Sequence, residues 1–259
     1  MPPAGLSDAE ALLAIAGRAA RAAGRYLAAE PRRDVVPVAE TAHDIKLHAD
    51  QASEQRIVDV LSTGPSIPII AEERLAGSLS SDDVVRWIVD PLDGTMNYAQ
   101  GIPFCCVSVA LWRGDLPLLG VVYDFDRDEM FSAAMGLGAW LNGSTMHVRS
   151  KSPNRAVLCT GFPAGTDFAP AAVQRFVEQV GMFRKIRLLG SAALSLAYLA
   201  AGRVDAYFER DIRIWDVAAG LALVRAAGGE YICAPSTVPH ALTVYAHNGM
   251  CPWAGPDLA

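Results

Sequence analysis

Apolar side chains recur every three or four positions near the start of the chain, which is the spacing of one helix face. The repeat runs through residues 12–19, so the sequence predicts an amphipathic helix there. Ser7 and Glu10 form a capping box that would open this helix, and Pro31 would end it. A second helix is predicted over residues 48–62, where apolar positions again share a face.

The middle of the chain carries short apolar runs separated by turn residues, and a helical repeat is not evident there. Such runs, rich in β-branched side chains, are typical of buried strands. Their close spacing predicts an antiparallel meander. The runs lie at residues 67–71, 86–89, 105–112, 116–123 and 129–134.

The last third of the chain alternates between strand and helix patterns. The whole pattern predicts an α/β protein with a layered α+β organisation. Residues 1–150 would form an N-terminal α+β part and residues 151–259 a C-terminal α/β part, packed as one compact unit. In the second part, strands are predicted at 156–161, 185–189, 205–209, 230–233 and 242–246, and helices at 170–181, 191–200 and 216–227.

Candidate chemistry begins where the predicted strand at 86–89 ends. Asp90 and Asp93 lie on either side of a proline, and Gly94 and Thr95 follow. Two carboxylates this close repel each other unless a cation neutralises them, and their oxygen ligands suit Mg²⁺ better than Zn²⁺. The alternative is an Asx-type turn in which the aspartates bond the local backbone. The segment on its own does not separate a metal site from a turn.

A second acidic turn has a simpler interpretation. Asp124, Asp126 and Asp128 follow the spacing that opens a calcium-binding loop. However, the sixth position is Glu129 where such a loop needs glycine, and the twelfth is Met135 where it needs glutamate. The segment is therefore predicted to be a charged hairpin turn.

Acidic and hydroxyl side chains also occur in the predicted helices. Asp50 and Glu54 lie four residues apart and so share a helix face, and Glu54 is interpreted as part of a solvated acidic stripe. Asp216 is placed to cap the helix over 216–227, a role worth about 1 kcal/mol, and Ser191 is placed to cap the preceding helix. Capping and metal binding are compatible, so both interpretations of Asp216 remain open.

Composition and charge narrow the function classes. The chain has 259 residues, of which 52% are apolar and 19% charged, as expected for a globular protein. The net charge of −6 argues against a nucleic-acid partner held by backbone neutralisation, so no such partner is expected. An anionic substrate would then need bound cations or local amides to attract it.

The sequence also bears on location. No apolar run approaches the ~20 residues of a membrane span, and the first residues lack the basic and apolar blocks of a signal peptide. The five cysteines, an odd number without metal-finger spacing, suggest reduced thiols. These features predict a cytoplasmic protein without a membrane partner.

Six segments spread over nearly the whole chain complete the argument. They are Asp50, Glu72-Glu73, Asp90-Pro91-Leu92-Asp93-Gly94-Thr95, the stretch 136–143, the stretch 189–193, and Trp215-Asp216 with the small residues after it. In this order and spacing they resemble the inositol monophosphatase family. That family belongs to the lithium-sensitive, Mg²⁺-dependent phosphatases, together with fructose-1,6-bisphosphatases and 3′(2′),5′-bisphosphate nucleotidases. The resemblance implies a sugar-phosphatase-like fold of alternating helix and sheet layers, and a homodimer.

The resemblance also implies a set of metal ligands. Glu72, Asp90 and the backbone carbonyl of Leu92 would bind a first Mg²⁺. Asp90, Asp93 and Asp216 would bind a second. Glu72 would also reach a third, weaker ion, so that two or three ions neutralise the phosphate and activate water.

Further roles follow from the same resemblance. Thr95 and Asp50 would orient and deprotonate the attacking water beside Glu72, with inversion at phosphorus and no covalent intermediate. The backbone amides of Gly94 and Thr95 would hold phosphate oxygens. The residues implied on the substrate side are Asp93, Gly94, Thr95, Gly190, Ser191, Ala192, Glu209 and Asp216.

Two residues bear on substrate choice. Glu209 is placed at the end of its predicted strand, where a carboxylate accepts hydrogen bonds from the hydroxyls of a polyol. Arg213 on the following loop offers a donor fork suited to a phosphate, although a solvated arginine is the more ordinary interpretation because loops commonly expose this residue. The sequence favours Glu209, and with it a polyol.

The chain departs from the family pattern upstream of the acids. Leu47 stands where the family has threonine, Ala71 replaces a common glycine, and the segment 44–46 does not align with a family lysine. The departures at Leu47 and at 44–46 concern the loop and the third ion, and they leave the two-ion core intact.

The predicted function is Mg²⁺-dependent hydrolysis of a small phosphorylated metabolite, with inositol monophosphate as first choice. The alternatives are removal of the 3′-phosphate of a nucleoside bisphosphate, or a sugar or histidinol phosphatase. A catalytically idle interaction module is less favoured, because the acidic residues of the pattern are all present.

Overall fold

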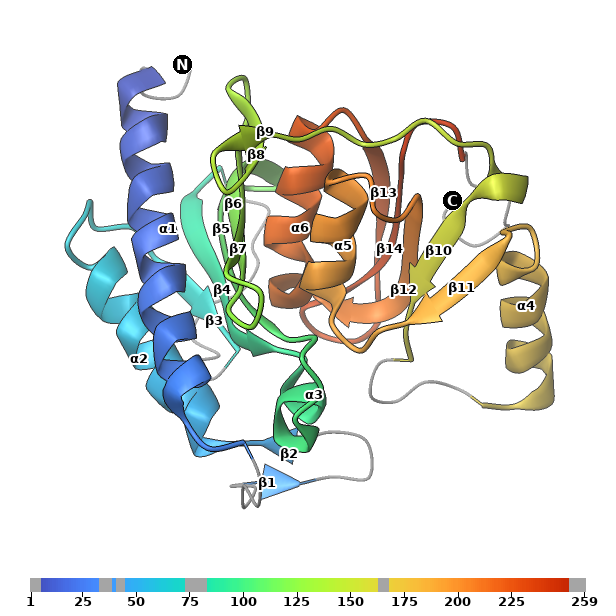
Figure 1. Ribbon diagram of the computed structural model, residues 1–259, viewed down its shortest axis with the longest axis horizontal. Helices are drawn as coiled ribbons and strands as arrows, with labels where there is room; N and C mark the ends of the chain where they lie inside the picture. The colour runs from blue at the N-terminus through green and yellow to red at the C-terminus, as the bar shows by residue number, and fades with distance from the viewer. Residues whose placement is uncertain (1–5, 33–38, 41–44, 73–82, 163–167, 252–259) are drawn as a thin grey trace.

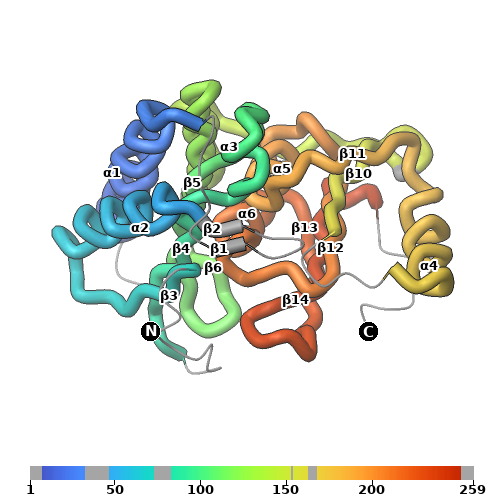
Figure 2. The backbone as a smooth tube through the Cα atoms, turned by 90° about the horizontal axis from the view of Figure 1, so that it is seen from below, coloured from blue at the N-terminus to red at the C-terminus, as the bar shows by residue number. Residues whose placement is uncertain are grey.

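Helices and sheets alternate in five layers (Figure 1). The computed structural model of the protein describes residues 6–32, 39–40, 45–72, 83–162 and 168–251. The layered arrangement confirms the predicted α/β class. Seen from below, the layers keep the same order across the molecule (Figure 2).

The first helix layer covers one face of a seven-stranded sheet. It contains α1 (Leu6–Ala29) and α2 (His48–Leu61). The sheet has the order β3-β4-β5-β6-β7-β8-β9, and all its pairs except β3–β4 are antiparallel, so the predicted meander is confirmed. Its strands are β3 (Ile69–Ala71), β4 (Val85–Asp93), β5 (Cys106–Arg113), β6 (Leu116–Asp124), β7 (Glu129–Ala134), β8 (Gly138–Leu141) and β9 (Ser144–Thr145).

Two buried helices, α5 (Ala192–Ala200) and α6 (Ile214–Ala226), fill the layer between the sheets. Small residues let them approach closely. A Cβ added at Gly220 of α6 would lie 2.4 Å from the Leu196 Cβ of α5, and one at Gly120 of β6 would lie 2.5 Å from the Ala219 carbonyl oxygen of α6. The close approach of α5, α6 and β6 therefore depends on these two glycines.

The second sheet and α4 (Pro170–Val180) form the remaining layers. The sheet has five strands in the order β11-β10-β12-β14-β13. A short 3₁₀ helix, η1 (Pro153–Arg155), precedes it. The strands are β10 (Val157–Thr160), β11 (Lys185–Leu188), β12 (Ala206–Arg213), β13 (Glu230–Pro235) and β14 (Ala241–His247).

Several boundaries differ from the predicted ones. Helix α1 already begins at Leu6, so Ser7 lies inside the helix instead of capping it. Six elements were not predicted as such: α3 (Thr95–Gln100), the antiparallel pair β1 (Ala39–Glu40) and β2 (Ile45–Lys46), the strands β8 and β9, and η1. The division into parts at residue 150 stays a prediction. Among the described residues, no helix is long and apolar enough to cross a membrane.

Candidate metal and phosphate site

The end of β4 forms the centre of the site. The pairing of β4 with β5 shifts register between Asp90 and Asp93, so the strand is distorted where the two acids lie. Asp90 Oδ1 accepts a hydrogen bond from the Leu92 amide at 2.9 Å, which is the local bond expected of an Asx-type turn. Gly94 has φ 86°, a left-handed conformation that a β-carbon disfavours. The acidic pair is therefore part of an Asx-type turn, so the turn and the possible metal site are the same segment.

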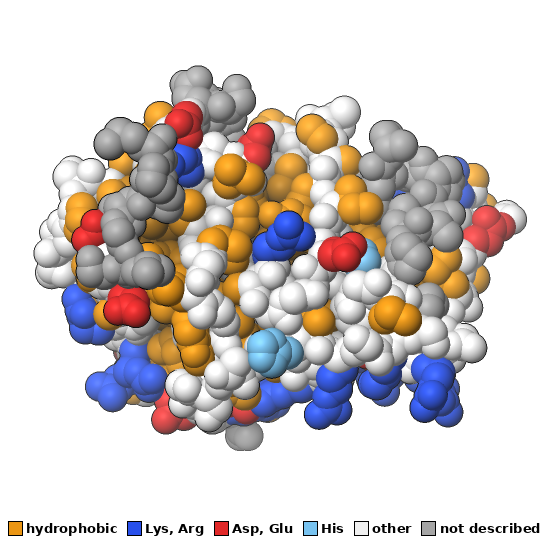
Figure 3. Space-filling view, turned by 90° about the horizontal axis from the view of Figure 1, so that it is seen from above, with side chains coloured by type: hydrophobic (Ala, Val, Ile, Leu, Met, Phe, Trp, Pro, Cys, Tyr) orange, Lys and Arg blue, Asp and Glu red, His pale blue; other side chains and the backbone are white. Residues whose placement is uncertain are grey.

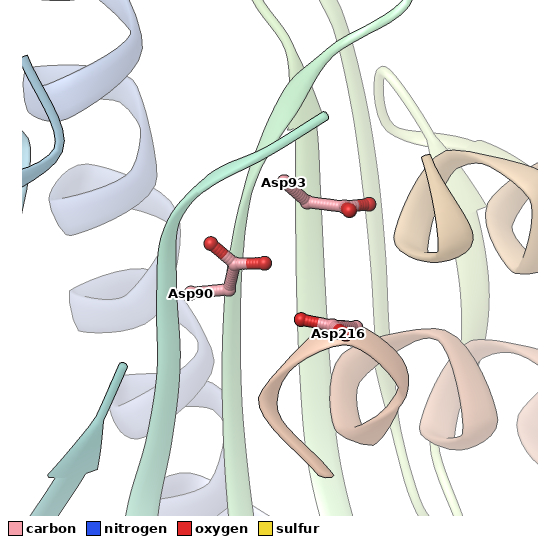
Figure 4. A group of neighbouring side chains, drawn as sticks. All are labelled: Asp90, Asp93 and Asp216. Carbon is pink, nitrogen blue, oxygen red and sulfur yellow. The ribbon is translucent and has the colours of Figure 1, made fainter. Parts of the chain in front are cut away.

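A third aspartate comes from the other half of the chain. Asp216 lies in the first turn of α6, two residues after the helix begins at Ile214. The prediction that it caps the helix is thus wrong, because the helix extends back past it. One oxygen from each of Asp90, Asp93 and Asp216 lies within 4.8 Å of the others. Figure 4 shows these three carboxylates pointing into one space between β4 and α6.

The start of α5 holds Asp93 in place. Ser191 Oγ donates to Asp93 Oδ2 at 2.5 Å, and the Ala193 amide donates to the same oxygen at 2.7 Å. Ser191 also accepts a bond from the Leu194 amide at 3.2 Å, which confirms that it caps α5. A single hydroxyl therefore connects the cap of one helix to a carboxylate of a distant strand.

Burial and mutual repulsion determine the protonation of these acids. Burial raises the pKa of Asp93 to about 6, although the bonds from Ser191 and Ala193 oppose the rise. Burial, followed by the charges of Glu72, Asp93 and Asp216, raises the pKa of Asp90 well above its usual value. Burial and the charge of Asp93 do the same for Asp216. A divalent cation would remove this cost, and carboxylate oxygens are the ligands that hard cations prefer.

Asp50 and Thr95 meet beside this cluster, as predicted for the water-activating pair. Thr95 Oγ1 lies 3.3 Å from Asp50 Oδ1 and 2.9 Å from the Leu92 carbonyl oxygen, so its hydroxyl can donate to either. Asp50 Oδ2 accepts the Leu47 amide at 2.7 Å and caps the start of α2. The backbone at Leu47 supplies this bond, so the loss of the family threonine there leaves the helix start intact.

Helix α2 is buried more deeply than its sequence suggests. Glu54 is only 2% exposed, so its assignment to a solvated acidic stripe is wrong. The helix contacts both α1 and β4, so the side that carries Glu54 is covered, while Gln51, Gln55 and Asp59 stay exposed. On the same helix, Ser53 Oγ donates to the Pro91 carbonyl oxygen at 2.7 Å. This contact supports the turn and was missed, although Ser53 lies one helical turn after Asp50.

The predicted substrate-side residues line one cavity of about 640 Å³. Asn97, which the sequence analysis missed, helps to form it by donating to the carbonyl oxygens of Phe104 and Leu189 at 2.8 Å each. It thereby joins α3 to the loop before α5. The lining includes Glu72, Asp90, Leu92, Asp93, Gly94, Thr95, Gly190, Ser191, Ala192, Glu209, Arg213 and Asp216.

Glu209 and Arg213 both face this cavity from β12. Glu209 does not end the strand, which continues to Arg213 past a register shift after Glu209. Burial and the charge of Asp93 raise the pKa of Glu209 to about 8. Arg213 Nη1 donates to the Pro239 carbonyl oxygen, so its guanidinium is partly engaged by the backbone. Glu73, by contrast, lies outside the described residues.

The layered fold brings together three acidic side chains that could hold a metal ion, on the wall of a cavity of about 640 Å³. The family model of the inositol monophosphatase family matches residues 8–252. The chain therefore belongs to the inositol monophosphatase family, a family of metal-dependent phosphatases.

Individual relatives support the assignment. The chain is 41% identical to the Nus factor SuhB of Pasteurella multocida (strain Pm70), over 84% of this chain and 83% of that protein. It is 39% identical to the Nus factor SuhB of Escherichia coli (strain K12), over the same shares. The inositol monophosphatase of Anabaena (Nostoc) sp. PCC 7120 has the same fold, with a TM-score of 0.79 and 34% identity over 93% of this chain and 92% of that one.

These relatives correct one prediction. The expectation that the chain has no nucleic-acid partner is contradicted, because relatives about 40% identical are named Nus factors. The expectation rested on a net charge of −6 for the whole chain, and a total charge says nothing about how charges are distributed. Figure 3 shows Lys and Arg side chains gathered along one edge of the face it presents. A locally basic edge is compatible with an acidic chain.

Proposed function

We propose that this chain is a Mg²⁺-dependent phosphatase of small phosphate monoesters, with inositol monophosphate as its first candidate substrate. The observation that carries the proposal is the convergence of three carboxylates, two of them buried on β4 and one half-buried on α6, within 4.8 Å of one another. A protein gains nothing in stability from such mutual repulsion. The arrangement is therefore best explained by the cations it would hold.

The donor set fits hard divalent ions. Asp90, Asp93 and Asp216 supply carboxylates, and Glu72 and the Leu92 carbonyl lie on the wall of the same cavity. We assign these five residues to two Mg²⁺ ions, with Glu72 able to serve a third. Bound there, the ions would supply charge neutralisation and a more acidic water.

The chain's own residues would position the water and the phosphate. Asp50 holds Thr95 Oγ1 beside the cluster, and we assign to this pair the task of orienting the water and accepting its proton, with Glu72 next to it. The backbone N–H groups of Gly94 and Thr95 are assigned to the phosphate oxygens. Since no nucleophilic side chain is required, the reaction would invert the configuration at phosphorus.

The alcohol part of the ester would lie toward Gly190, Ser191, Ala192 and Glu209. Glu209 as a carboxylate accepts hydrogen bonds from neighbouring hydroxyls, which favours a polyol. Glu209→Gln should therefore raise KM for inositol monophosphate without changing the Mg²⁺ dependence. The competing substrate class, a nucleoside bisphosphate, would depend instead on Arg213. If hydrolysis of a nucleoside bisphosphate is lost in Arg213→Ala and unchanged in Glu209→Gln, that substrate class is favoured.

A phosphate-release panel tests the proposed function directly. The panel contains inositol phosphates, sugar phosphates, nucleoside bisphosphates and histidinol phosphate, each measured with Mg²⁺ and with a chelator. Chelator-sensitive release from at least one ester is expected, with inhibition by lithium. Failure to release phosphate from every ester would favour an interaction module with an idle site. The same preparation, sized by light scattering, tests the homodimer, while the cytoplasmic location stays a prediction.

The relatives' name supports a second role. We propose that the chain also shares the function for which they are called Nus factors. The test is expression of this chain in Escherichia coli K12 lacking its own SuhB, beside the Asp93→Asn variant. Rescue by both proteins would separate this role from hydrolysis. Rescue by the unmodified chain alone would attribute it to the phosphatase, and rescue by neither would reject the second role.

A further inference from the structure

Ser53 lies where helix α2 passes the acidic turn at the end of β4. Its side chain is fully buried, and its hydroxyl donates to the Pro91 carbonyl oxygen at 2.7 Å. Ser53 belongs to none of the six segments that resemble the family, so those motifs give it no role. Its contact nevertheless falls between two residues assigned to the metal, Asp90 and Leu92.

The carbonyl group that Ser53 contacts lies in the distorted part of β4. The pairing with β5 holds at Asp90 and again at Asp93, and the register shifts between them, where Pro91 lies. Pro91 is buried, and a buried carbonyl oxygen needs a hydrogen-bond donor. Ser53 supplies that donor from another element.

The same peptide group also orients Asp90. The Pro91 carbonyl and the Leu92 N–H belong to one planar unit. Ser53 holds the carbonyl side of this unit, and its N–H side donates to Asp90 Oδ1 at 2.9 Å. A rotation of the peptide would therefore disturb both bonds. Figure 4 shows the Asp90 carboxylate directed at the space it shares with Asp93 and Asp216.

Helix α2 contacts the turn at a second point. Thr95 Oγ1 lies 3.3 Å from Asp50 Oδ1 and 2.9 Å from the Leu92 carbonyl oxygen. Asp50 and Ser53 are three positions apart and so lie on one face of the helix. One helix face thus reaches the turn on both sides of Leu92, whereas Asp93 is held by α5.

We propose that Ser53 is a positioning residue for the metal site, because it fixes the peptide group that orients the Asp90 carboxylate before a divalent cation binds. The inference rests on the proposed metal-dependent function and names a residue that acts through Asp90 without touching the ion. The simpler alternative is that the hydroxyl only satisfies a buried carbonyl. In that case its loss would lower stability and leave cation affinity unchanged.

Three variants separate these two roles. Ser53→Ala removes the hydroxyl with little change in volume, and Ser53→Thr restores it. Tyr245→Phe is the matched control, because the Tyr245 hydroxyl also donates to a backbone carbonyl, that of Cys251, at 2.5 Å. Tyr245 is likewise fully buried, but it lies in β14 and outside the lining of the acidic cavity.

The first measurement follows the melting temperature while Mg²⁺ is added to metal-free protein, since a cation that binds only the folded state raises it. The apparent Mg²⁺ dissociation constant should rise about 10-fold or more in Ser53→Ala, as is typical when a residue that orients a metal ligand is lost. It should stay within about twofold in Tyr245→Phe and return toward the original value in Ser53→Thr. A Ser53→Ala protein with a lower metal-free melting temperature but an unchanged constant would overturn the proposal.

Phosphate release gives the second measurement. The Mg²⁺ concentration for half-maximal hydrolysis should rise in Ser53→Ala, while kcat at saturating Mg²⁺ stays within about threefold because the bound cation then holds Asp90 itself. A Mg²⁺ effect on melting that Ser53→Ala weakens, without hydrolysis of any ester, would reject the phosphatase function alone. Hydrolysis with the same Mg²⁺ dependence in both proteins would reject the role of Ser53 alone. No effect of Mg²⁺ on the unmodified chain would reject both.

Discussion

Two groups of three aspartates in this protein differ in how their negative charges are neutralised. In the turn after β6, each of Asp124, Asp126 and Asp128 has its own arginine. Arg127 donates to Asp124 at 2.9 Å, Arg32 lies 2.6 Å from Asp126, and Arg21 lies 3.0 Å from Asp128. The first group, which we call the paired turn, is neutralised by the chain itself.

The second group, Asp90, Asp93 and Asp216, is the acidic cluster of the candidate site. Its charges face one another within 4.8 Å, and their mutual repulsion helps to raise the pKa values of Asp90 and Asp216. The paired turn needs no ion, as its departure from the calcium-loop pattern already indicated. The comparison shows that neutralisation by partners, more than the number of acids, distinguishes a structural turn from a candidate metal site.

The largest expected effect is a loss of turnover, which a substitution in the acidic cluster should cause and one in the paired turn should not. Asp93→Asn removes one charge but keeps an amide oxygen for Ser191 and Ala193, so turnover should fall about 1,000-fold for a lost metal ligand while the fold survives. The matched control is Asp126→Asn in the paired turn, which should keep turnover within about twofold because it lies outside the cavity lining. Phosphate release under saturating Mg²⁺ measures both. Near-normal turnover of Asp93→Asn at low Mg²⁺ would contradict the assignment of Asp93 as a metal ligand.

The next effect is on stability and pH. In metal-free buffer the melting temperature should fall as the pH rises above about 4, the usual pKa of a carboxyl group. The fall should continue through the folded-state pKa values, which are about 6 for Asp93 and about 8 for Glu209. The sign follows because a carboxyl whose folded pKa is raised binds its proton more tightly when folded, so stability is lost as that proton leaves. In the paired turn, hydrogen bonds from Tyr123 and Arg21 lower the pKa of Asp128, so its contribution is lost as pH falls.

Calorimetric scans at several pH values check this prediction. Mg²⁺ should raise the melting temperature most at pH 8, where the cluster is most charged, and Asp93→Asn should flatten the metal-free slope. A melting temperature that rises steadily to pH 8 without metal would contradict the repulsion described for the acidic cluster.

A smaller effect is expected when the paired turn loses its innermost partner. Arg127→Gln leaves Asp124, which is fully buried, without its guanidinium, and the free energy of unfolding should fall by ~1–3 kcal/mol. The Asp124 carboxylate keeps the amides of Asp126 and Arg127, each at 3.1 Å, which limits the loss. Urea denaturation measures the change, and Arg127→Lys should restore part of it. A stabilised Arg127→Gln protein would show that the pairing is not what holds this turn.

The smallest effect is expected at the surface pair. Arg21→Gln breaks the contact with Asp128, whose side chain is 73% exposed, and exposed ion pairs contribute little because water screens them. The urea midpoint and the turnover should both equal those of the unmodified chain within error. A clear loss of stability would mean that Arg21 acts through its other contact, the Tyr123 ring, whose centroid lies 5.0 Å away.

The acidic side chains of α2 and α6 also show what sequence patterns cannot predict. The apolar periodicity predicted α2 within one residue, but it placed Glu54 in solvent because a pattern identifies a face and not what covers it. In the protein α1 and β4 both contact that helix, and Glu54 is buried. The start of α6 was also predicted wrongly. Asp216 resembled a capping residue, but the helix begins two residues earlier, at Ile214.

The sequence by itself determined the local features of this protein. These are most of the helices and strands and the acidic turn at Asp90–Asp93, all of which depend on residues a few positions apart, where propensity, turn chemistry and periodicity act. The order of the family motifs along the chain could also be read from the sequence.

The tertiary structure decided which acids are neutralised and which are left to face one another. Asp93 meets Ser191, and Asp126 meets Arg32, across nearly a hundred residues of chain. The cavity lined by Thr160, Phe176 and Phe208 likewise joins β10, α4 and β12 only in the folded protein. Such contacts are set by the packing of whole layers, and no short-range pattern encodes the partner that packing brings to a buried charge.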